Sequence, residues 1–274
     1  MRMDTPALQI DGIEIHIEGP ADGEVVVMIH GWPDTWRLWD AQVAALSPTR
    51  RCVRFTLPGF DIDHPRPAPT LDGMVAFFAE VVDTVSPDRP VVLMLHDWGC
   101  VFGLQYALRH AQRVSRVVAA DVGDSGSPAV SAGQTWGQRW RVANYQLKLA
   151  LAWYVGGARG DRMTRRMAQL QRAPTDVSLI SASMNAPYAM RRLGARGGFK
   201  NALPARPAWP TLFIWGTRKT MMFHSADWIA DLEARGDCRI VGIEAGHWMM
   251  VTRAKEFNAA VLDWLGSDAA SRSH

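Results

Sequence analysis

A carboxylate stands directly after an apolar run in the segment 91–103, which reads VVLMLHDWGCVFG. Residues 91–95 have the composition of a buried strand, and Asp97 follows them with only His96 between. Burying an unpaired charge costs free energy, so a carboxylate at this point needs a structural or a chemical reason. Two reasons are open: Asp97 caps the helix expected from Trp98 onward, or it is a reactive group held at the end of the strand.

The spacing around Asp97 favours the reactive role. A strand, one residue, the reactive residue, one residue, a glycine and then a helix form the layout of a nucleophile elbow. Such a sharp turn lifts one side chain above the edge of a sheet. The N-terminus of the following helix stabilises an anion, so we expect Asp97 to be ionised at neutral pH. An ionised carboxylate attacks an electrophilic carbon without help from a base and forms an ester.

A second turn, His30-Gly31-Trp32-Pro33, follows the apolar run at 25–29. Gly31 lets the backbone turn closely, so the N–H of Trp32 can point at a developing oxyanion. The N–H of Trp98, one residue past the nucleophile, is the other candidate donor. The motif alone is also compatible with a simple turn.

A candidate base lies near the C-terminus. His247 follows the predicted strand 238–243 through Ala245 and Gly246 and precedes a helical pattern. A loop in this place holds one imidazole over the edge of the sheet, where it can take a proton from water.

The base needs an acid to fix its tautomer and to stabilise the imidazolium. The loop after the predicted strand 211–215 carries Lys219 and no carboxylate. The end of the predicted strand 114–120 carries Asp121 and Asp124 instead. We favour Asp121 because it ends the apolar run directly, and Asp124 stays open.

The elements that must position these residues alternate between strand and helix patterns. This alternation is typical of a mostly parallel sheet covered by helices on both faces, an α/β fold. The predicted strands are 13–17, 25–29, 52–55, 91–95, 114–120, 211–215 and 238–243. The predicted helices are 36–46, 71–85, 98–110, 225–234 and 254–265.

The alternation stops in the middle of the chain. Between about residues 124 and 210 the patterns are helical, rich in Arg, Met, Trp and Tyr, with no convincing strand. We therefore expect a core in two parts, 1–124 and 209–274, with a helical cap at 125–208 inserted between them.

The composition excludes several classes of function. The 274 residues are 48% hydrophobic and 21% charged, with a net charge of +3 and scattered basic residues, which does not indicate nucleic-acid binding. No signal pattern and no apolar run of about 18 residues is visible, so we expect no membrane segment and a cytoplasmic protein. The three cysteines lack metal-ligand spacing, which predicts free thiols and no metal site.

Together these motifs resemble the α/β-hydrolase fold, in particular its branch with an aspartate nucleophile, which holds epoxide hydrolases and haloalkane dehalogenases. The resemblance covers almost the whole chain and is carried by HGWPDTW (30–36), HDWG (96–99), the segment 97–121 and GHW (246–248). It implies a mostly parallel sheet flanked by helices with an inserted helical cap.

Some members of this branch place the acid where Asp121 stands, which supports that residue. The chain departs from the family pattern at two positions. Leu95 stands two residues before the nucleophile, where a smaller residue is commoner, and Lys219 stands where many relatives carry Asp.

The resemblance also bears on the electrophile. Opening an epoxide gives an alkoxide, which needs a proton donor, and the epoxide hydrolases of this family use two cap tyrosines. Tyr145 lies 48 residues after Asp97, and Tyr188 lies 59 residues before His247, both near the family positions.

We therefore expect an epoxide hydrolase that forms a vicinal diol through an ester on Asp97. No metal or organic cofactor is needed, because the nucleophile and the base are protein groups, and the aromatic lobe predicts an apolar pocket for a small apolar epoxide. We also expect a monomer or homodimer. The tryptophans expected to line the substrate pocket are Trp32, Trp98, Trp136 and Trp140.

Three alternatives stay open. A haloalkane dehalogenase would use the same nucleophile, although Trp32 stands where its relatives often carry a halide-binding Asn. A fluoroacetate-type (haloacid) dehalogenase needs a cationic pocket and a cap histidine, and no histidine lies between His110 and His224. A non-catalytic member that binds a ligand is supported only by Lys219.

Overall fold

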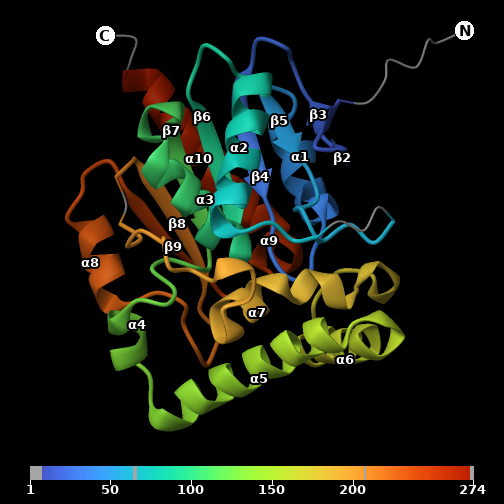
Figure 1. Ribbon diagram of the computed structural model, residues 1–274. Helices are drawn as coiled ribbons and strands as arrows, with labels where there is room; N and C mark the ends of the chain where they lie inside the picture. Colours follow the sequence, from blue (N-terminus) through green and yellow to red (C-terminus); the bar gives the residue numbers. More distant parts are fainter. Residues whose placement is uncertain (1–7, 64–66, 207, 272–274) are drawn as a thin grey trace, which may run out of the picture.

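A computed structural model describes residues 8–63, 67–206 and 208–271 of the chain. Its centre is a seven-stranded sheet in which the first strand is antiparallel to its neighbour and all the others are parallel (Figure 1). In spatial order the strands are β3 (His16–Glu18), β5 (Arg50–Arg54), β4 (Glu24–Ile29), β6 (Val91–His96), β7 (Val114–Ala120), β8 (Thr211–Gly216) and β9 (Arg239–Ile243). The predicted fold class is confirmed.

The central strands contain long apolar runs, 25–29 in β4 and 91–95 in β6, because both of their faces are buried. In β4, Val27 and Ile29 belong to one hydrophobic cluster, whereas Val26 and Met28 belong to the other. Successive side chains of a strand point to opposite faces of the sheet, so a doubly covered strand needs a continuous apolar run.

Two groups of helices cover the two faces of the sheet. Side chains of α2 (Leu71–Val85), α3 (Trp98–Arg109) and α8 (Ala226–Glu233) pack in the first cluster. Side chains of α1 (Asp40–Leu46), α9 (Met249–Thr252) and α10 (Ala254–Ser271) pack in the second. No helix in the described part of the chain has the length and apolar composition needed to cross a membrane.

A layer of helices lies beyond one end of the sheet, with α7 between the core and the long helix α5 (Figure 1). Residues 125–206, all of which the structure describes, form helices and turns and no strand. The elements are α4 (Pro128–Ala132), α5 (Trp136–Val155), α6 (Gly157–Gln171), η3 (Val177–Leu179), η4 (Ala182–Asn185), α7 (Ala186–Leu193) and η5 (Ala195–Gly197). These elements fall within the segment predicted as a cap.

The N-terminal part differs from the prediction of one strand at 13–17. The structure has β1 (Gln9–Ile10) and β2 (Ile13–Glu14) as a separate antiparallel pair, and only then β3. The turn between β1 and β2 contains Asp11 and Gly12, both with positive φ, which suits a tight hairpin. The predicted helix 36–46 likewise begins as a 3₁₀ turn, η1 (Trp36–Trp39), before α1.

Candidate active site

Asp97 lies in a sharp turn between β6 and α3. Its backbone has φ 52° and ψ −120°, a conformation that side chains other than glycine rarely adopt and that is typical of strained functional positions. Two glycines make the turn possible. A Cβ atom on Gly31 would lie 2.4 Å from Asp97 Oδ1, and one on Gly99 would lie 2.2 Å from the Ile29 carbonyl oxygen. The sequence therefore forms the predicted elbow only with glycine at both positions.

The large side chain of Leu95 is accommodated from the helix side. Leu95 is fully buried, and a Cβ atom on Gly103 of α3 would lie 2.5 Å from its Cδ2. The missing side chain at Gly103 therefore makes room for the larger residue under the elbow. The departure from the family pattern at Leu95 is matched by a second residue one turn into α3.

The imidazole of His247 lies between two carboxylates. Its Nδ1 is 2.5 Å from Asp121 Oδ2, and its Nε2 is 3.5 Å from Asp97 Oδ2. Asp124 is engaged elsewhere, because it accepts hydrogen bonds from the hydroxyl of Ser127 and from the backbone N–H and hydroxyl of Ser225. The structure thus places Asp121, and not Asp124, beside the predicted base.

This position changes the pKa of His247. Burial alone would lower it, but the charges of Asp121 and Asp97 and their hydrogen bonds outweigh burial and raise the pKa to about 9. The ring is therefore an imidazolium at neutral pH while both carboxylates are charged. Because the charge of Asp97 helps to hold this proton on His247, the imidazolium loses it more easily once Asp97 is no longer charged.

Lys219 is the second cation at the acid. Its ammonium lies 2.5 Å from Asp121 Oδ1, and the backbone N–H of Gly216 donates to the same oxygen at 3.1 Å. Burial alone would raise the pKa of Asp121, but the Lys219 ammonium and the His247 ring hold it well below its usual range. The residue that departs from the family pattern thus binds the acid from the other side.

The backbone N–H of Trp32 donates to Asp97 Oδ1 at 2.8 Å. The amide nitrogen of Trp98 lies close to the same loop, since a Cβ on Gly31 would be 2.5 Å from it. Burial alone would raise the pKa of Asp97, but His247 and the Trp32 N–H bring it below its ordinary value. Both predicted amide donors therefore lie at the nucleophile, which stays ionised.

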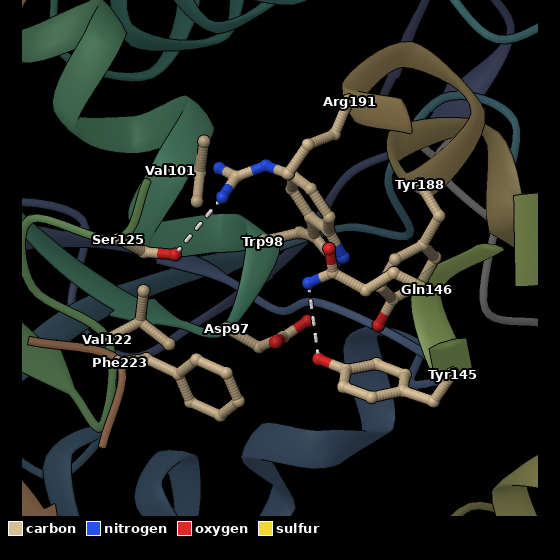
Figure 2. Close-up of a pocket in the computed structure, with 10 residues that line it drawn as sticks. All are labelled: Asp97, Trp98, Val101, Val122, Ser125, Tyr145, Gln146, Tyr188, Arg191 and Phe223. Carbon is tan, nitrogen blue, oxygen red and sulfur yellow. Dashed lines mark hydrogen bonds between the residues drawn. The ribbon is translucent and has the colours of Figure 1, made fainter. Parts of the chain in front are cut away.

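Two tyrosines of the cap line the cavity in front of Asp97. Tyr145 comes from α5 and Tyr188 from α7, with ring centroids 6.1 Å apart, and both rings direct their hydroxyl ends toward that cavity (Figure 2). Burial raises the pKa of Tyr145 to about 12 and that of Tyr188 well above its usual value. Both hydroxyls therefore keep their protons at neutral pH and can donate them.

The cavity is not lined by apolar groups alone. Its lining residues are Asp97, Trp98, Val101, Val122, Ser125, Tyr145, Gln146, Tyr188, Arg191 and Phe223 (Figure 2). The sequence interpretation missed Gln146, which donates to the Tyr145 hydroxyl at 3.3 Å, and it missed Arg191. A signal for Arg191 existed: it lies three residues after Tyr188, so both project from one face of a helix.

The expectation that Trp136 and Trp140 line the pocket is corrected by the structure. Their side chains are 79% and 56% exposed, and neither is among the residues lining the cavity. Trp136 precedes Tyr145 by nine residues, which is half a turn out of phase on an α-helix, and Trp140 precedes it by five. The face of α5 that turns Tyr145 toward Asp97 therefore turns both tryptophans toward solvent.

Trp32 supports the cavity wall from behind. Its indole N–H donates to Asn185 Oδ1 at 2.8 Å, and its ring meets Tyr188 edge to face with centroids 5.7 Å apart. Its side chain thus joins core to cap, whereas Trp98 lines the cavity itself.

A buried carboxylate that the sequence interpretation did not single out lies behind the histidine loop. Asp34 accepts hydrogen bonds from the hydroxyl of Thr175 in the cap, at 2.5 Å, and from the indole N–H of Trp248, at 3.0 Å. Burial raises the pKa of Asp34 to about 6. His96 Nδ1 lies 3.9 Å away from the same carboxylate. Asp34 therefore links the cap to the histidine loop, and it lies near the end of the nucleophile strand.

No cluster of three or more metal-ligating side chains occurs among the described residues. The groups assembled here are a charged carboxylate, a base paired with an acid, backbone N–H donors and two protonated phenols. Such a set can form a covalent ester with an electrophilic carbon and then hydrolyse it.

Comparison with known proteins identifies the family of the chain. The family model described as alpha/beta hydrolase fold matches residues 24–254. A cis-3-alkyl-4-alkyloxetan-2-one decarboxylase of Xanthomonas campestris pv. campestris is 30% identical over 225 residues, which are 73% of this chain and 74% of that protein. Epoxide hydrolase 2 of Caenorhabditis elegans is 31% identical over 121 residues, 42% of this chain and only 34% of that protein.

Solved structures show the same fold at lower sequence identity. An epoxide hydrolase of Bacillus megaterium in complex with an inhibitor superposes with a TM-score of 0.71 at 17% identity, covering 95% of this chain and 99% of that one. A thermophilic esterase of Thermogutta terrifontis superposes with a TM-score of 0.64 at 20% identity, covering 95% and 96%. The chain therefore belongs to the α/β-hydrolase fold family.

Proposed function

We propose that the protein is an epoxide hydrolase that converts an epoxide into a vicinal diol through an ester on Asp97. The observation that carries this proposal is the pair of protonated phenols, Tyr145 and Tyr188, that face the same cavity as the nucleophile. An oxirane oxygen needs a proton donor when its ring opens, and these two hydroxyls are placed to supply it.

In the first step Asp97 Oδ2 attacks an oxirane carbon and the carbon–oxygen bond of the ring breaks. Oδ2 is assigned as the attacking atom because Oδ1 accepts from the Trp32 N–H. The ring oxygen takes a proton from one of the two tyrosines. This leaves an ester on Asp97, a neighbouring hydroxyl on the substrate and a tyrosinate.

The second step follows from the charge that Asp97 loses. Without that charge the pKa of His247 falls, since Asp97 contributes to holding it near 9. The imidazolium then returns a proton to the tyrosinate and becomes a neutral base. His247 takes a proton from water, the hydroxide attacks the ester carbonyl, and the Trp32 N–H stabilises the oxyanion. The bond between the ester carbonyl and the substrate oxygen breaks, and the leaving alkoxide takes the proton of the Asp97 carboxylic acid. The diol then leaves, with the charged Asp97 and the imidazolium restored.

The test is to trap the ester. His247→Gln should react once with styrene oxide and stop, because no base activates the water. Intact-protein mass spectrometry should show the mass of the substrate added, and peptide mapping should place it on Asp97. Asp97→Asn is the control without adduct. If neither styrene oxide nor a panel of alkyl oxides gives a diol with the wild type or an adduct with His247→Gln, the proposal is wrong.

A second candidate is the decarboxylation of an oxetan-2-one, a strained four-membered cyclic ester. It is supported by the length of the match to the Xanthomonas relative and by the cation Arg191 in the cavity. Attack of Asp97 on the saturated ring carbon that is bonded to the ring oxygen would break that bond and release a carboxylate beside Arg191. Loss of carbon dioxide with departure of the Asp97 carboxylate would then give an alkene.

The two candidates differ in what His247 does. Decarboxylation needs no water, so His247→Gln would still form alkene from a cis-dialkyl oxetan-2-one. Epoxide hydrolysis needs the base, so the same variant would make no diol. Gas chromatography of both products from one enzyme preparation separates the two reactions.

A further inference from the structure

Arg191 is a cation in the wall of the catalytic cavity, and it forms no ion pair with any described carboxylate. Its guanidinium carbon lies 4.9 Å from the centroid of the Trp98 ring and 5.5 Å from that of Phe199. Its hydrogen bond within the described part of the chain goes to the Ser125 hydroxyl, at a long 3.4 Å (Figure 2). No described carboxylate lies within 4.0 Å of the Arg191 guanidinium, the limit for an ion pair.

The neighbouring arginine shows the contrast. Arg192 is exposed and donates to Gln146 Oε1 at 2.8 Å, so it binds a group of the protein. Arg191 instead lies on aromatic rings, which attract a cation but accept none of its five N–H donors in the way an oxygen does. Holding a largely desolvated cation without an anion costs free energy, so a role outside the free protein is expected.

The loop after β7 is shaped around this guanidinium. Gly126 has a φ of 91°, and a Cβ atom at this position would lie 2.9 Å from Arg191 Nη1. Ser125, the preceding residue, supplies the hydroxyl in contact with it. The place of Arg191 is therefore built by the core, by the rings of Trp98 and Phe199, and by α7.

Arg191 lies where two hollows meet. Arg191, Ser125 and Val101 line the catalytic cavity, and the same three residues line a larger cleft between α3, α4 and α8. A molecule that reaches Asp97 from the cleft must pass the guanidinium. An anionic group on such a molecule finds a planar set of donors there, and a carboxylate matches it with two oxygens.

We propose that Arg191, with the Ser125 hydroxyl, binds a carboxylate of the substrate, so that the epoxide handled by this enzyme is an epoxy acid. This inference rests on the proposed epoxide hydrolysis for the reaction and on the geometry of Arg191 for the anion. The carboxylate lies at the junction with the cleft, and the oxirane carbons lie before Asp97. The apolar part of the substrate contacts Val122 and Phe223 on the opposite wall.

The experiment compares an epoxy acid with its neutral isostere. Diol formation is measured for 3-phenylglycidate and for 3-phenylglycidamide, which differ only in the charged group. We expect kcat/KM of the wild type to favour the acid by about tenfold or more, the size of a charge-assisted hydrogen-bond pair. In Arg191→Gln the kcat/KM for the acid should fall while that for the amide stays unchanged, so the preference is lost. Arg191→Lys should recover part of it.

The matched control is Arg206→Gln. Arg206 is exposed on the cleft wall and does not line the catalytic cavity, so its substitution removes one positive charge from the cleft without touching the anion site. The acid preference should stay at its wild-type value. Equal rates for acid and amide in the wild type, or an equal loss of both in Arg191→Gln, would overturn the proposal.

A binding measurement tests the carboxylate site separately from the epoxide reaction. Calorimetry with phenylacetate and phenylacetamide needs no reaction, and only the acid should bind, with at least tenfold weaker binding in Arg191→Gln. If the acid binds in this way but no epoxide reacts, or if fluoroacetate loses fluoride instead, the carboxylate site stands and epoxide hydrolysis falls. If epoxides react but phenylacetate does not bind better than its amide, the reaction stands and the carboxylate site falls.

Discussion

The Lys219 ammonium and the His247 ring bind the two oxygens of one carboxylate, that of Asp121. Asp121 is fully buried and Lys219 nearly so. The carboxylate therefore serves two cations, one that takes part in the proposed chemistry and one that does not. Lys219 keeps the acid ionised, and it also draws some of the negative potential away from the imidazole.

Replacing Lys219 with Met should leave the Asp121 carboxylate with one cation. The electrostatic potential at His247 becomes more negative, so the pKa of the imidazole rises further. We therefore expect the pH–rate profile to shift to higher pH. We also expect the free energy of unfolding to fall by about 3 kcal/mol, because one partner of a buried pair is gone. Arg218→Met, which removes an exposed partner of Glu244, is the control for both measurements. An unchanged profile would show that Lys219 does not act on the imidazole.

The raised pKa of His247 makes stability depend on pH. The pKa is about 9 in the folded protein and 6.5 in the unfolded chain, so this group stabilises the fold fully below pH 6.5 and ceases to do so as pH rises through 9. Urea unfolding of the wild type should show this loss, on the order of 3 kcal/mol. His247→Gln should lack it, and a parallel fall in that variant would contradict the raised pKa.

Asp34 also makes a contribution to stability that is lost as pH rises, but at lower pH than His247. Its pKa is raised from 3.8 to about 6 by burial, so its contribution to stability is present below pH 3.8 and is lost as pH rises through 6. Asp34→Asn keeps the shape and does not titrate, and its one amide oxygen can replace only one of the two carboxylate oxygens that accept from Thr175 and Trp248. The difference in unfolding free energy between wild type and variant should therefore change between pH 4 and 6 and be constant above pH 7.

The pairing of Leu95 with Gly103 predicts a coupled pair of substitutions. Gly103→Ala places a methyl group 2.5 Å from Leu95 Cδ2 and should destabilise the protein by about 1–3 kcal/mol, as overpacking does. In Leu95→Ala/Gly103→Ala the added methyl group finds space, so the second substitution should cost less than it does alone. Additive costs in the double-mutant cycle would show that the two residues do not share this space.

The parts of the site that follow from local spacing could be predicted from the sequence. Asp97 and His247 each belong to a short motif at the end of a strand, and the sheet brings strand ends together whatever the details of packing. The face of a cap helix is different. Tyr145 and Trp136 lie on one helix, and which of them points inward depends on how α5 packs, which no spacing within the helix decides.

Contacts between side chains from different parts of the chain could not be predicted from the sequence either. Lys219 and Asp121 come from two different strand ends, and a lysine in place of an acid reads as a loss until its ammonium is seen beside the carboxylate. Arg191 was hidden for a similar reason, because a cation in a helical, Arg-rich segment reads as a solvated surface group. Its burial arises largely from Trp98 and Gly126, which are distant in the chain, together with Phe199.

The ion pair at Lys219 has a consequence for the whole catalytic interior. In the resting protein the charges of Asp97, Asp121, His247 and Lys219 sum to zero, and the proposed cycle keeps the sum at zero through ester formation and hydrolysis when the transient tyrosinate is counted with them. Only protons already within the site are exchanged, so no counterion has to enter or leave a poorly hydrated space. Arg191 lines the same cavity and is not part of that sum, and a substrate that carries a single negative charge would offset its charge.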